Sequence, residues 1–259
     1  MAKFIFTLAF ALLWSSAGFA ENPFIGHWKV DPAKSQLTGS ISSIAAAGPD
    51  TWTFHEDGYS WTIKADGTPQ STPFGDDTAM KVVGAKAWQF TNTSHGRLLG
   101  TETWVLSADE NTIKWTIAGQ KENGEPFSAT GVMKRVAGKS GFEGTWETTE
   151  VQMTFTEVDI AANGDDGITV TLPEDGTTYS LKFDGKEYPE HGPRLPSGMT
   201  VSATRTGART VKAITRLNGK PFDEEEWEVS PDGTTQTYTQ YTIGSPKPAI
   251  VILHRMDTP

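Results

Sequence analysis

The sequence of 259 residues predicts an all-β protein built as two tandem antiparallel β-barrels. Its strand-like runs are short, rich in β-branched and aromatic residues, and alternate apolar with polar side chains. Asp-Gly and Asn-Gly pairs separate many of these runs, and such pairs supply the positive φ angles that hairpin turns need. The chain also repeats itself once. A meander of about eight strands in each copy usually closes into a barrel or folds into a sandwich.

The internal repeat rests on four matches that occur in the same order in both halves of the chain. The matches are Phe24-Ile25-Gly26-His27-Trp28 with Phe142-Glu143-Gly144-Thr145-Trp146, Trp104-Val105-Leu106-Ser107-Ala108-Asp109 with Trp227-Glu228-Val229-Ser230-Pro231-Asp232, Asn123-Gly124-Glu125-Pro126 with Ile243-Gly244-Ser245-Pro246, and Lys134-Arg135 with His254-Arg255. A small, flexible run at 137–141 joins the copies. We therefore expect one barrel domain at 21–138 and a second at 139–259, after a leader at 1–20.

The leader has the pattern of a secretory signal peptide. Lys3 supplies the positive charge, an apolar run from Phe4 to Trp14 follows, and small residues precede a cleavage site before Glu21. That run is too short to span a bilayer as a helix, and no later stretch reaches the required length. We expect the mature chain to be soluble and exported, either to the periplasm or outside the cell. An uncleaved membrane anchor is the alternative.

Composition excludes several classes of function. The net charge of −10 and the pI of about 5.0 argue against binding to nucleic acid or to anionic lipid, because both need clustered Lys and Arg. The absence of cysteine excludes thiolate catalysis, thiolate metal sites and haem attachment. The five histidines show no metal-ligand spacing, and no phosphate loop or dinucleotide motif occurs. We therefore expect no metal and no cofactor.

Three parts of the sequence carry a family resemblance. Phe24-x-Gly-x-Trp28 with the following Lys29-x-Asp31-x-x-Lys34-Ser35 resembles the opening of lipocalin-like domains in secreted bacterial proteins. The run 183–192, FDGKEYPEHG, and the ending with Val229-Ser-Pro-Asp-Gly and Arg255 are similar to the same group. The first copy lacks the Gly-Lys-x-Tyr-Pro run, and the chain lacks the lipocalin disulfide.

This resemblance implies a lipocalin-like (calycin-like) fold but no activity, since the group it points to is functionally uncharacterised. In lipocalins, the Trp of Gly-x-Trp lies on the first strand and packs across the barrel base. The resemblance therefore gives that part to Trp28 and Trp146.

Tryptophan is unevenly distributed, with six in the first copy and only Trp146 and Trp227 in the second. Strand alternation places several first-copy rings on apolar faces that should point inward. We interpret them as the lining of a lumen that binds a small apolar or aromatic ligand. The candidates are Tyr59, Trp61, Trp88, Phe90, Trp104 and Trp115. The alternative is that these rings simply fill a small barrel, whose interior is just wide enough for side chains.

Acid–base candidates support a second hypothesis, a cofactor-free lyase, isomerase or hydrolase that uses a barrel pocket. Glu102 and Glu225 each stand two residues before a repeated Trp, and Tyr188 and His254 complete the set. Alternation along the acidic run 223–228 places Glu225 on the face of Trp227 and the even-numbered glutamates on the solvated face. A surface interaction module remains a third interpretation, and the sequence leaves the oligomeric state open.

A short helix at Gln36–Ala47, covering a barrel mouth, is the one departure from β-structure that the sequence favours.

Overall fold

The structure is a computed structural model, and it describes residues 22–56, 58–94, 96–121, 124–138, 140–153, 157–173, 176–192, 195, 197–243, 245 and 247–256. The expected signal peptide lies outside the described residues, as do His95 and the turn residues Asp57, Asn123 and Asp175. Every regular element in the described part is a β-strand, which confirms the all-β prediction. No helix in this part is long and apolar enough to cross a membrane.

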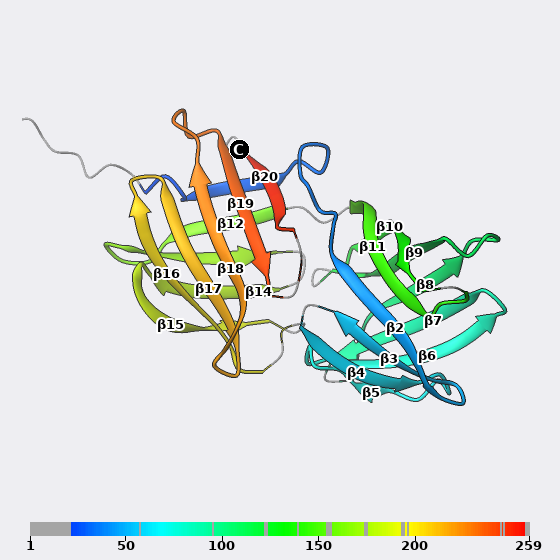
Figure 1. The fold of residues 1–259 in the computed structure, drawn as a ribbon. Helices are drawn as coiled ribbons and strands as arrows, with labels where there is room; N and C mark the ends of the chain where they lie inside the picture. Colours follow the sequence, from blue (N-terminus) through cyan, green and yellow to red (C-terminus); the bar gives the residue numbers. More distant parts are fainter. Residues whose placement is uncertain are drawn as a thin grey trace, which may run out of the picture.

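The described strands are, in chain order, β1 (Gly26–Val30), β2 (Ile41–Gly48), β3 (Thr51–Glu56), β4 (Tyr59–Lys64), β5 (Gln70–Ser71), β6 (Asp77–Gly84), β7 (Ala87–Ser94), β8 (Arg97–Leu106), β9 (Thr112–Gln120), β10 (Pro126–Ala137), β11 (Gly144–Met153), β12 (Glu157–Ala162), β13 (Gly167–Leu172), β14 (Thr177–Lys182), β15 (Asp184–His191), β16 (Met199–Gly207), β17 (Thr210–Leu217), β18 (Lys220–Val229), β19 (Thr235–Thr242) and β20 (Ala249–Arg255). Most consecutive strands pair as antiparallel hairpins (Figure 1); the exceptions are β1 with β2, β4 with β5, and β11 with β12.

The strands form two antiparallel sheets, as the sequence predicts. Strands β1 and β12–β20 form a closed barrel, which we call the C-barrel. Strands β2–β11 form a second, nearly closed sheet, the N-barrel, whose end strands are β4 and β5. The Gln70 side chain spans this gap, because its Oε1 accepts from Lys64 N and its Nε2 donates to Lys64 O, both at 2.8 Å.

The two sequence copies exchange their first strands. Strand β1, from the first copy, pairs with β12 and β20 in the C-barrel. Strand β11, from the second copy, pairs with β10 and β2 in the N-barrel. In Figure 1 the blue β1 accordingly lies in the barrel that also holds the red β20. Each barrel therefore contains one strand that the repeat assigns to the other copy.

An arginine–tryptophan contact closes the base of the C-barrel. Trp28 is fully buried, and its indole Nε1 donates to Phe24 O at 2.9 Å. The Arg255 guanidinium lies 4.2 Å from the centroid of the Trp28 ring. It also donates to the carbonyl oxygens of Gly233 and Pro23, both at 2.7 Å. The guanidinium thus combines a cation–π contact with hydrogen bonds to loop carbonyls at the barrel base.

The N-barrel repeats this contact with residues from the opposite copies. Trp146 is fully buried and donates to Phe142 O at 2.9 Å, and Arg135 lies 4.1 Å from its ring centroid. Arg135 also donates to Glu110 O at 2.9 Å and to Glu143 O at 2.6 Å. In both barrels the arginine and the tryptophan therefore come from different sequence copies.

The glycine of each Gly-x-Trp motif is required by this contact. Gly26 and Gly144 have φ angles of 151° and 140°, which other residues rarely adopt. A Cβ atom on Gly26 would collide with Arg255 Nη1, and one on Gly144 would lie 2.7 Å from Arg135 Nη1. The spacing of glycine and tryptophan therefore leaves space for the arginine over the ring.

The predicted helix at Gln36–Ala47 is wrong. Residues Ile41–Gly48 form β2, which pairs with β3 and β11, and Gln36 bridges to Ile250 of β20. A helix of this length is marginal without tertiary packing, whereas two neighbouring strands offer backbone partners on both sides. The segment therefore becomes a strand and a link between the barrels.

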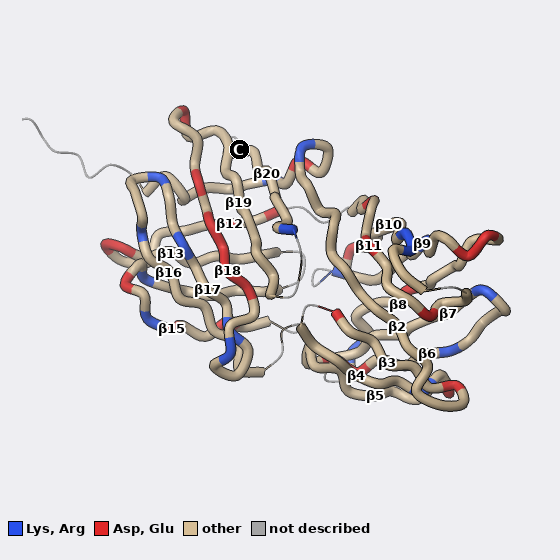
Figure 2. The backbone as a smooth tube through the Cα atoms, in the orientation of Figure 1, with Lys and Arg blue, Asp and Glu red and all other residues tan. Residues whose placement is uncertain are grey.

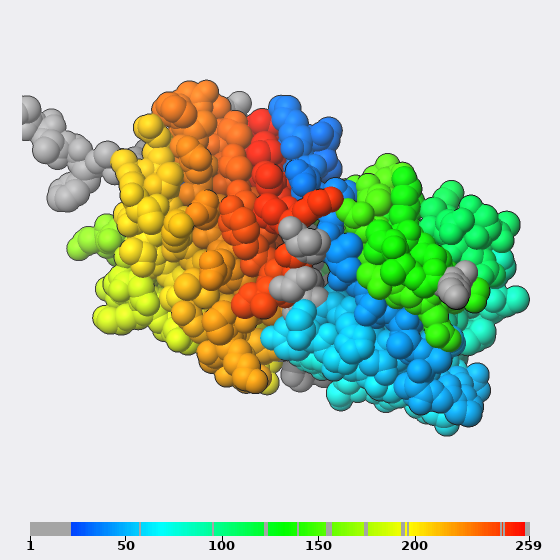
Figure 3. All heavy atoms as spheres, viewed as in Figure 1, coloured from blue at the N-terminus to red at the C-terminus, as the bar shows by residue number. Residues whose placement is uncertain are grey.

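The barrels touch along this linking segment and at one aromatic pair. Gly39 N donates to Thr148 O at 2.8 Å, and Lys247 forms an ion pair with Glu147 at 2.9 Å. Tyr59 of the N-barrel lies 5.6 Å from Phe222 of the C-barrel, measured between ring centroids. Figure 3 shows the two lobes side by side, with the blue N-terminal segment running from one to the other.

We predict that Trp28→Ala and Trp146→Ala each lower the free energy of unfolding by about 3–5 kcal/mol, because each leaves a large cavity in a core. Because the first strands are exchanged, each substitution should destabilise the barrel that is built mostly from the other sequence copy. Hydrogen exchange followed by mass spectrometry should show faster exchange in β12–β20 for Trp28→Ala and in β2–β10 for Trp146→Ala. Faster exchange of each variant in its own sequence copy would contradict the exchanged topology.

Candidate functional site

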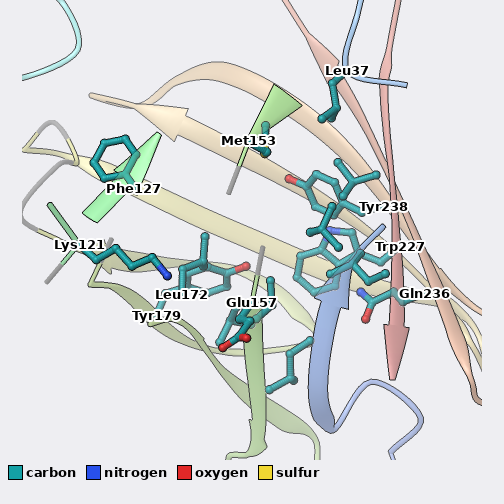
Figure 4. A pocket seen from close by; sticks show the side chains of 16 residues that line it. Leu37, Lys121, Phe127, Met153, Glu157, Leu172, Tyr179, Trp227, Gln236 and Tyr238 are labelled. Atoms are coloured by element: carbon teal, nitrogen blue, oxygen red, sulfur yellow. The ribbon is translucent and has the colours of Figure 1, made fainter. Parts of the chain in front are cut away.

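A cavity with a volume of about 420 Å³ lies inside the C-barrel. Its lining is mostly apolar and aromatic and comes from β1, β12–β14 and β18–β20, with residues of the N-barrel at its mouth (Figure 4). The lining residues are Val30, Leu37, Lys121, Phe127, Met153, Glu157, Val158, Ile160, Val170, Leu172, Tyr179, Trp227, Gln236, Tyr238, Val251 and Leu253.

Strand alternation aims these side chains inward. On β18, Trp227 is buried while Glu226 and Glu228 on either side are exposed. Figure 2 shows the run of acidic residues along β18, of which Glu224, Glu226 and Glu228 are exposed, as the sequence predicts. Tyr238 lies directly opposite Trp227 in the ladder, and the two rings stack with centroids 6.3 Å apart. The pairing register of β18 with β19 therefore determines which of their side chains form the cavity wall.

One polar group in this wall is unsatisfied. Gln236 is 4% exposed, and its amide Oε1 has no hydrogen-bond partner. A buried carbonyl oxygen without a donor costs free energy, so it favours a ligand that brings one. Lys121 and Glu157 supply the charged groups of the lining, and Lys121 lies 3.6 Å from Glu125.

A buried carboxyl stands behind the aromatic wall. Glu225 is 7% exposed and accepts hydrogen bonds from Thr215 Oγ1 and from Trp227 Nε1, both at 3.0 Å, and it also bonds with Tyr238. Burial raises the pKa of Glu225, and these hydrogen bonds oppose the rise. Glu225 therefore holds Trp227 and Tyr238 in place.

Two further acidic groups lie near Glu225, and each has an unsatisfied oxygen. Burial raises the pKa of Glu190 to about 7, and the neighbouring charges of Glu225 and Asp223 add to the rise. Burial also raises the pKa of Asp223, whose Oδ2 accepts from Gln240 at 2.8 Å. Glu190 Oε1 and Asp223 Oδ1 have no hydrogen-bond partner. The charges of Glu225 and Asp223 thus disfavour ionisation of Glu190, and the charge of Asp223 disfavours ionisation of Glu225.

The N-barrel holds a smaller pocket of about 180 Å³. Its lining includes four of the site residues predicted from the sequence, which are Trp61, Phe90, Glu102 and Trp104. Trp104 Nε1 donates to the Glu102 carboxylate, which reproduces the bond between Trp227 and Glu225 in the other barrel. The repeated Glu-x-Trp motif therefore builds the same hydrogen bond in both barrels.

The other three aromatic residues that the sequence predicted to bind a ligand do not line either cavity. Trp88 is 3% exposed and stacks on Phe142 with a centroid distance of 3.8 Å. Trp115 is half-buried against the N-barrel core, directly opposite Trp104 in the ladder. Tyr59 lies at the contact between the barrels. The barrel that is richer in tryptophan thus has the smaller open volume.

The remaining acid–base candidates lie away from the C-barrel cavity lining. Tyr188 donates to the Asp184 carboxylate at 3.2 Å on the barrel surface. His254 is partly exposed beside Asp31, with Nε2 3.2 Å from Asp31 Oδ2 and 3.1 Å from Lys34 Nζ. Because Leu253 points into the cavity, its neighbour His254 points outward. The structure does not bring Tyr188 or His254 together with Glu102 or Glu225.

The sequence interpretation missed Tyr179, Gln236, Tyr238 and Glu190. Alternation in Thr235–Thr242 places Gln236 and Tyr238 on one face, and that signal was present in the sequence. Nothing in a single sequence shows that Glu190 lies opposite Tyr179, because this pairing depends on the register of β14 with β15.

A comparison with known protein families matches none, and a search of curated proteins finds no relative. Within the described ranges, no group of three or more His, Asp or Glu side chains is placed to hold a metal ion.

We predict that Trp88→Ala lowers the free energy of unfolding of the ligand-free protein by about 3–5 kcal/mol, because the indole is packed in the core. Thermal and denaturant unfolding, with Trp115→Ala as the half-buried comparison, measure the effect. A loss below about 1 kcal/mol for Trp88→Ala would show that the ring faces open space.

The pKa of Glu190 predicts a pH dependence of stability. A carboxyl whose pKa is higher in the folded state holds its proton there, so its favourable contribution fades as pH rises from about 4.5 to 7. The variant Glu190→Gln should therefore gain stability relative to the wild type as pH rises, by about 1–3 kcal/mol between pH 5 and pH 8. Denaturant unfolding at the two pH values tests this, and a constant difference would contradict it.

Proposed function

We propose that this protein binds a small, largely apolar molecule in the cavity of the C-barrel. The cavity itself is the observation that carries the proposal. At about 420 Å³ it falls within the range of about 300–1,000 Å³ that small-molecule sites occupy. The largely apolar wall, with aromatic rings and few polar groups, is typical of such sites.

The polar groups of the cavity narrow the ligand chemistry. The unsatisfied Oε1 of Gln236 favours a ligand with a single donor, such as a hydroxyl or an N–H group. The rings of Tyr179, Trp227 and Tyr238 favour a flat or cyclic apolar body. The ligand that fits best is therefore an apolar, ring-containing molecule with one hydrogen-bond donor.

The proposal keeps the expectation of export and the lipocalin-like fold, both of which suit a carrier of poorly soluble molecules. It moves the main site from the first sequence copy to the barrel built mostly from the second. The reason is that Trp88 and its neighbours pack against one another in the N-barrel, whereas the C-barrel keeps open volume.

Binding is better supported than the alternative of a cofactor-free enzyme. The Glu225 carboxylate is engaged by Thr215, Trp227 and Tyr238 and does not line the cavity. A general acid or base must be within reach of the proton it transfers. The geometry therefore favours a role for Glu225 in holding the wall.

We predict that Leu172→Trp weakens binding of the neutral fluorescent probe N-phenyl-1-naphthylamine at least tenfold, because the larger ring fills the cavity. The matched control is Thr171→Trp, since alternation places the side chain of Thr171 on the opposite face of β13. Fluorescence titration measures both affinities. No probe binding to the wild type, or equal affinity in both variants, would reject the C-barrel cavity as the site.

A further inference from the structure

The pocket of the N-barrel has aromatic walls on several sides. Five rings line it, those of Phe54, Trp61, Phe74, Phe90 and Trp104. The centroids of Trp61 and Phe74 are 5.2 Å apart with nearly perpendicular planes, and those of Phe90 and Trp104 are 5.0 Å apart. The rings therefore come from four strands and one loop and enclose a space of about 180 Å³.

The charged groups that face this space are predominantly acidic. Glu102 lies in the pocket lining and accepts a hydrogen bond from Trp104 Nε1. Glu56 and Asp76 also line the pocket, and Asp76 accepts a hydrogen bond from Thr72. Among the described residues that line the pocket, His55 is the only one able to carry a positive charge, and none of them is a Lys or Arg.

We propose that this pocket is a second binding site, and that it takes a small organic cation such as a quaternary ammonium or amine group. A cation is attracted to the faces of Trp and Phe rings, and the attraction grows when water is excluded. Several rings around one space, together with a carboxylate, give the arrangement that holds quaternary ammonium groups in proteins. The described lining residues carry no fixed positive charge that would repel such a ligand.

The size of the pocket limits the ligand to a small head group. With less than half the volume of the C-barrel cavity, it accommodates a trimethylammonium group and not a large apolar body. This site is independent of the proposed function, because it shares no lining residue with the C-barrel cavity. Either site can fail its test without affecting the other.

The ionisation of Glu102 gives the site a pH signature. Burial raises the pKa of Glu102 to about 7, and the bond from Trp104 opposes the rise. A cation binds best to the ionised carboxylate, so affinity should rise as pH increases through 7. The other titratable groups that face the pocket are Glu56 and His55 on β3 and Asp76 on the loop before β6.

Choline and its neutral isostere 3,3-dimethyl-1-butanol provide a matched pair of probes for the full chain. Calorimetry or tryptophan fluorescence should show that choline binds at least tenfold more tightly than the alcohol at pH 8. Its affinity should fall about five- to tenfold between pH 8 and pH 6. Equal affinities for the two probes, an affinity independent of pH, or no choline binding at 10 mM would each overturn the proposal.

Two variants assign the site. Glu102→Gln should weaken choline binding at least tenfold and leave the alcohol unaffected, whereas the control Glu224→Gln removes an exposed charge from the C-barrel and should change neither. Trp61→Leu removes a cage ring without altering the carboxyl and should also weaken choline binding. Wild-type affinity for choline in either pocket variant would refute the assignment.

Discussion

The contact of an arginine guanidinium with a tryptophan ring is the interaction on which both barrels depend. Arg255 over Trp28 and Arg135 over Trp146 each close a barrel base and bind the carbonyl groups of the adjoining loops. In each pair the two residues come from different sequence copies. Neither barrel can therefore complete its base from residues of one sequence copy alone.

The two barrels share this arginine–tryptophan contact but differ in the side chains that fill their interiors. Both barrels keep a Glu-x-Trp motif in which the indole donates to the glutamate, at Glu102 in one and Glu225 in the other. Across the ladder, Trp104 faces Trp88 on one side, whereas the equivalent Trp227 faces the much smaller Val211. The repeated Glu-x-Trp motif thus has different neighbours in the two barrels, which leaves an aromatic pocket in the N-barrel and a larger apolar cavity in the C-barrel.

Much of the fold could be predicted from the sequence, because its signals are local. Alternation located most of the strands, and the spacing of Gly26 and Trp28 and of their counterparts helped to identify the repeat. The resemblance to lipocalins, and not the spacing, assigned Trp28 and Trp146 to the barrel bases. The strand exchange could not be predicted, since β1 and β11 carry the same Gly-x-Trp motif and that motif does not show which barrel each strand joins. The site was predicted only in part: strand alternation placed Trp61 and Trp88 on inward faces, but it cannot tell a ring that lines a pocket, such as Trp61, from one that packs on Phe142, such as Trp88.

The exchange of first strands is tested most directly by engineered disulfides, because the chain contains no cysteine of its own. Lys29 lies opposite Glu157 in the exchanged barrel, whereas in a barrel built from one copy it would take the place of Glu147, opposite Lys134. Under mild oxidation, the double variant Lys29→Cys/Glu157→Cys should form a disulfide within the monomer, and Lys29→Cys/Lys134→Cys should not. Cross-linking of the second pair and not the first would contradict the exchanged fold.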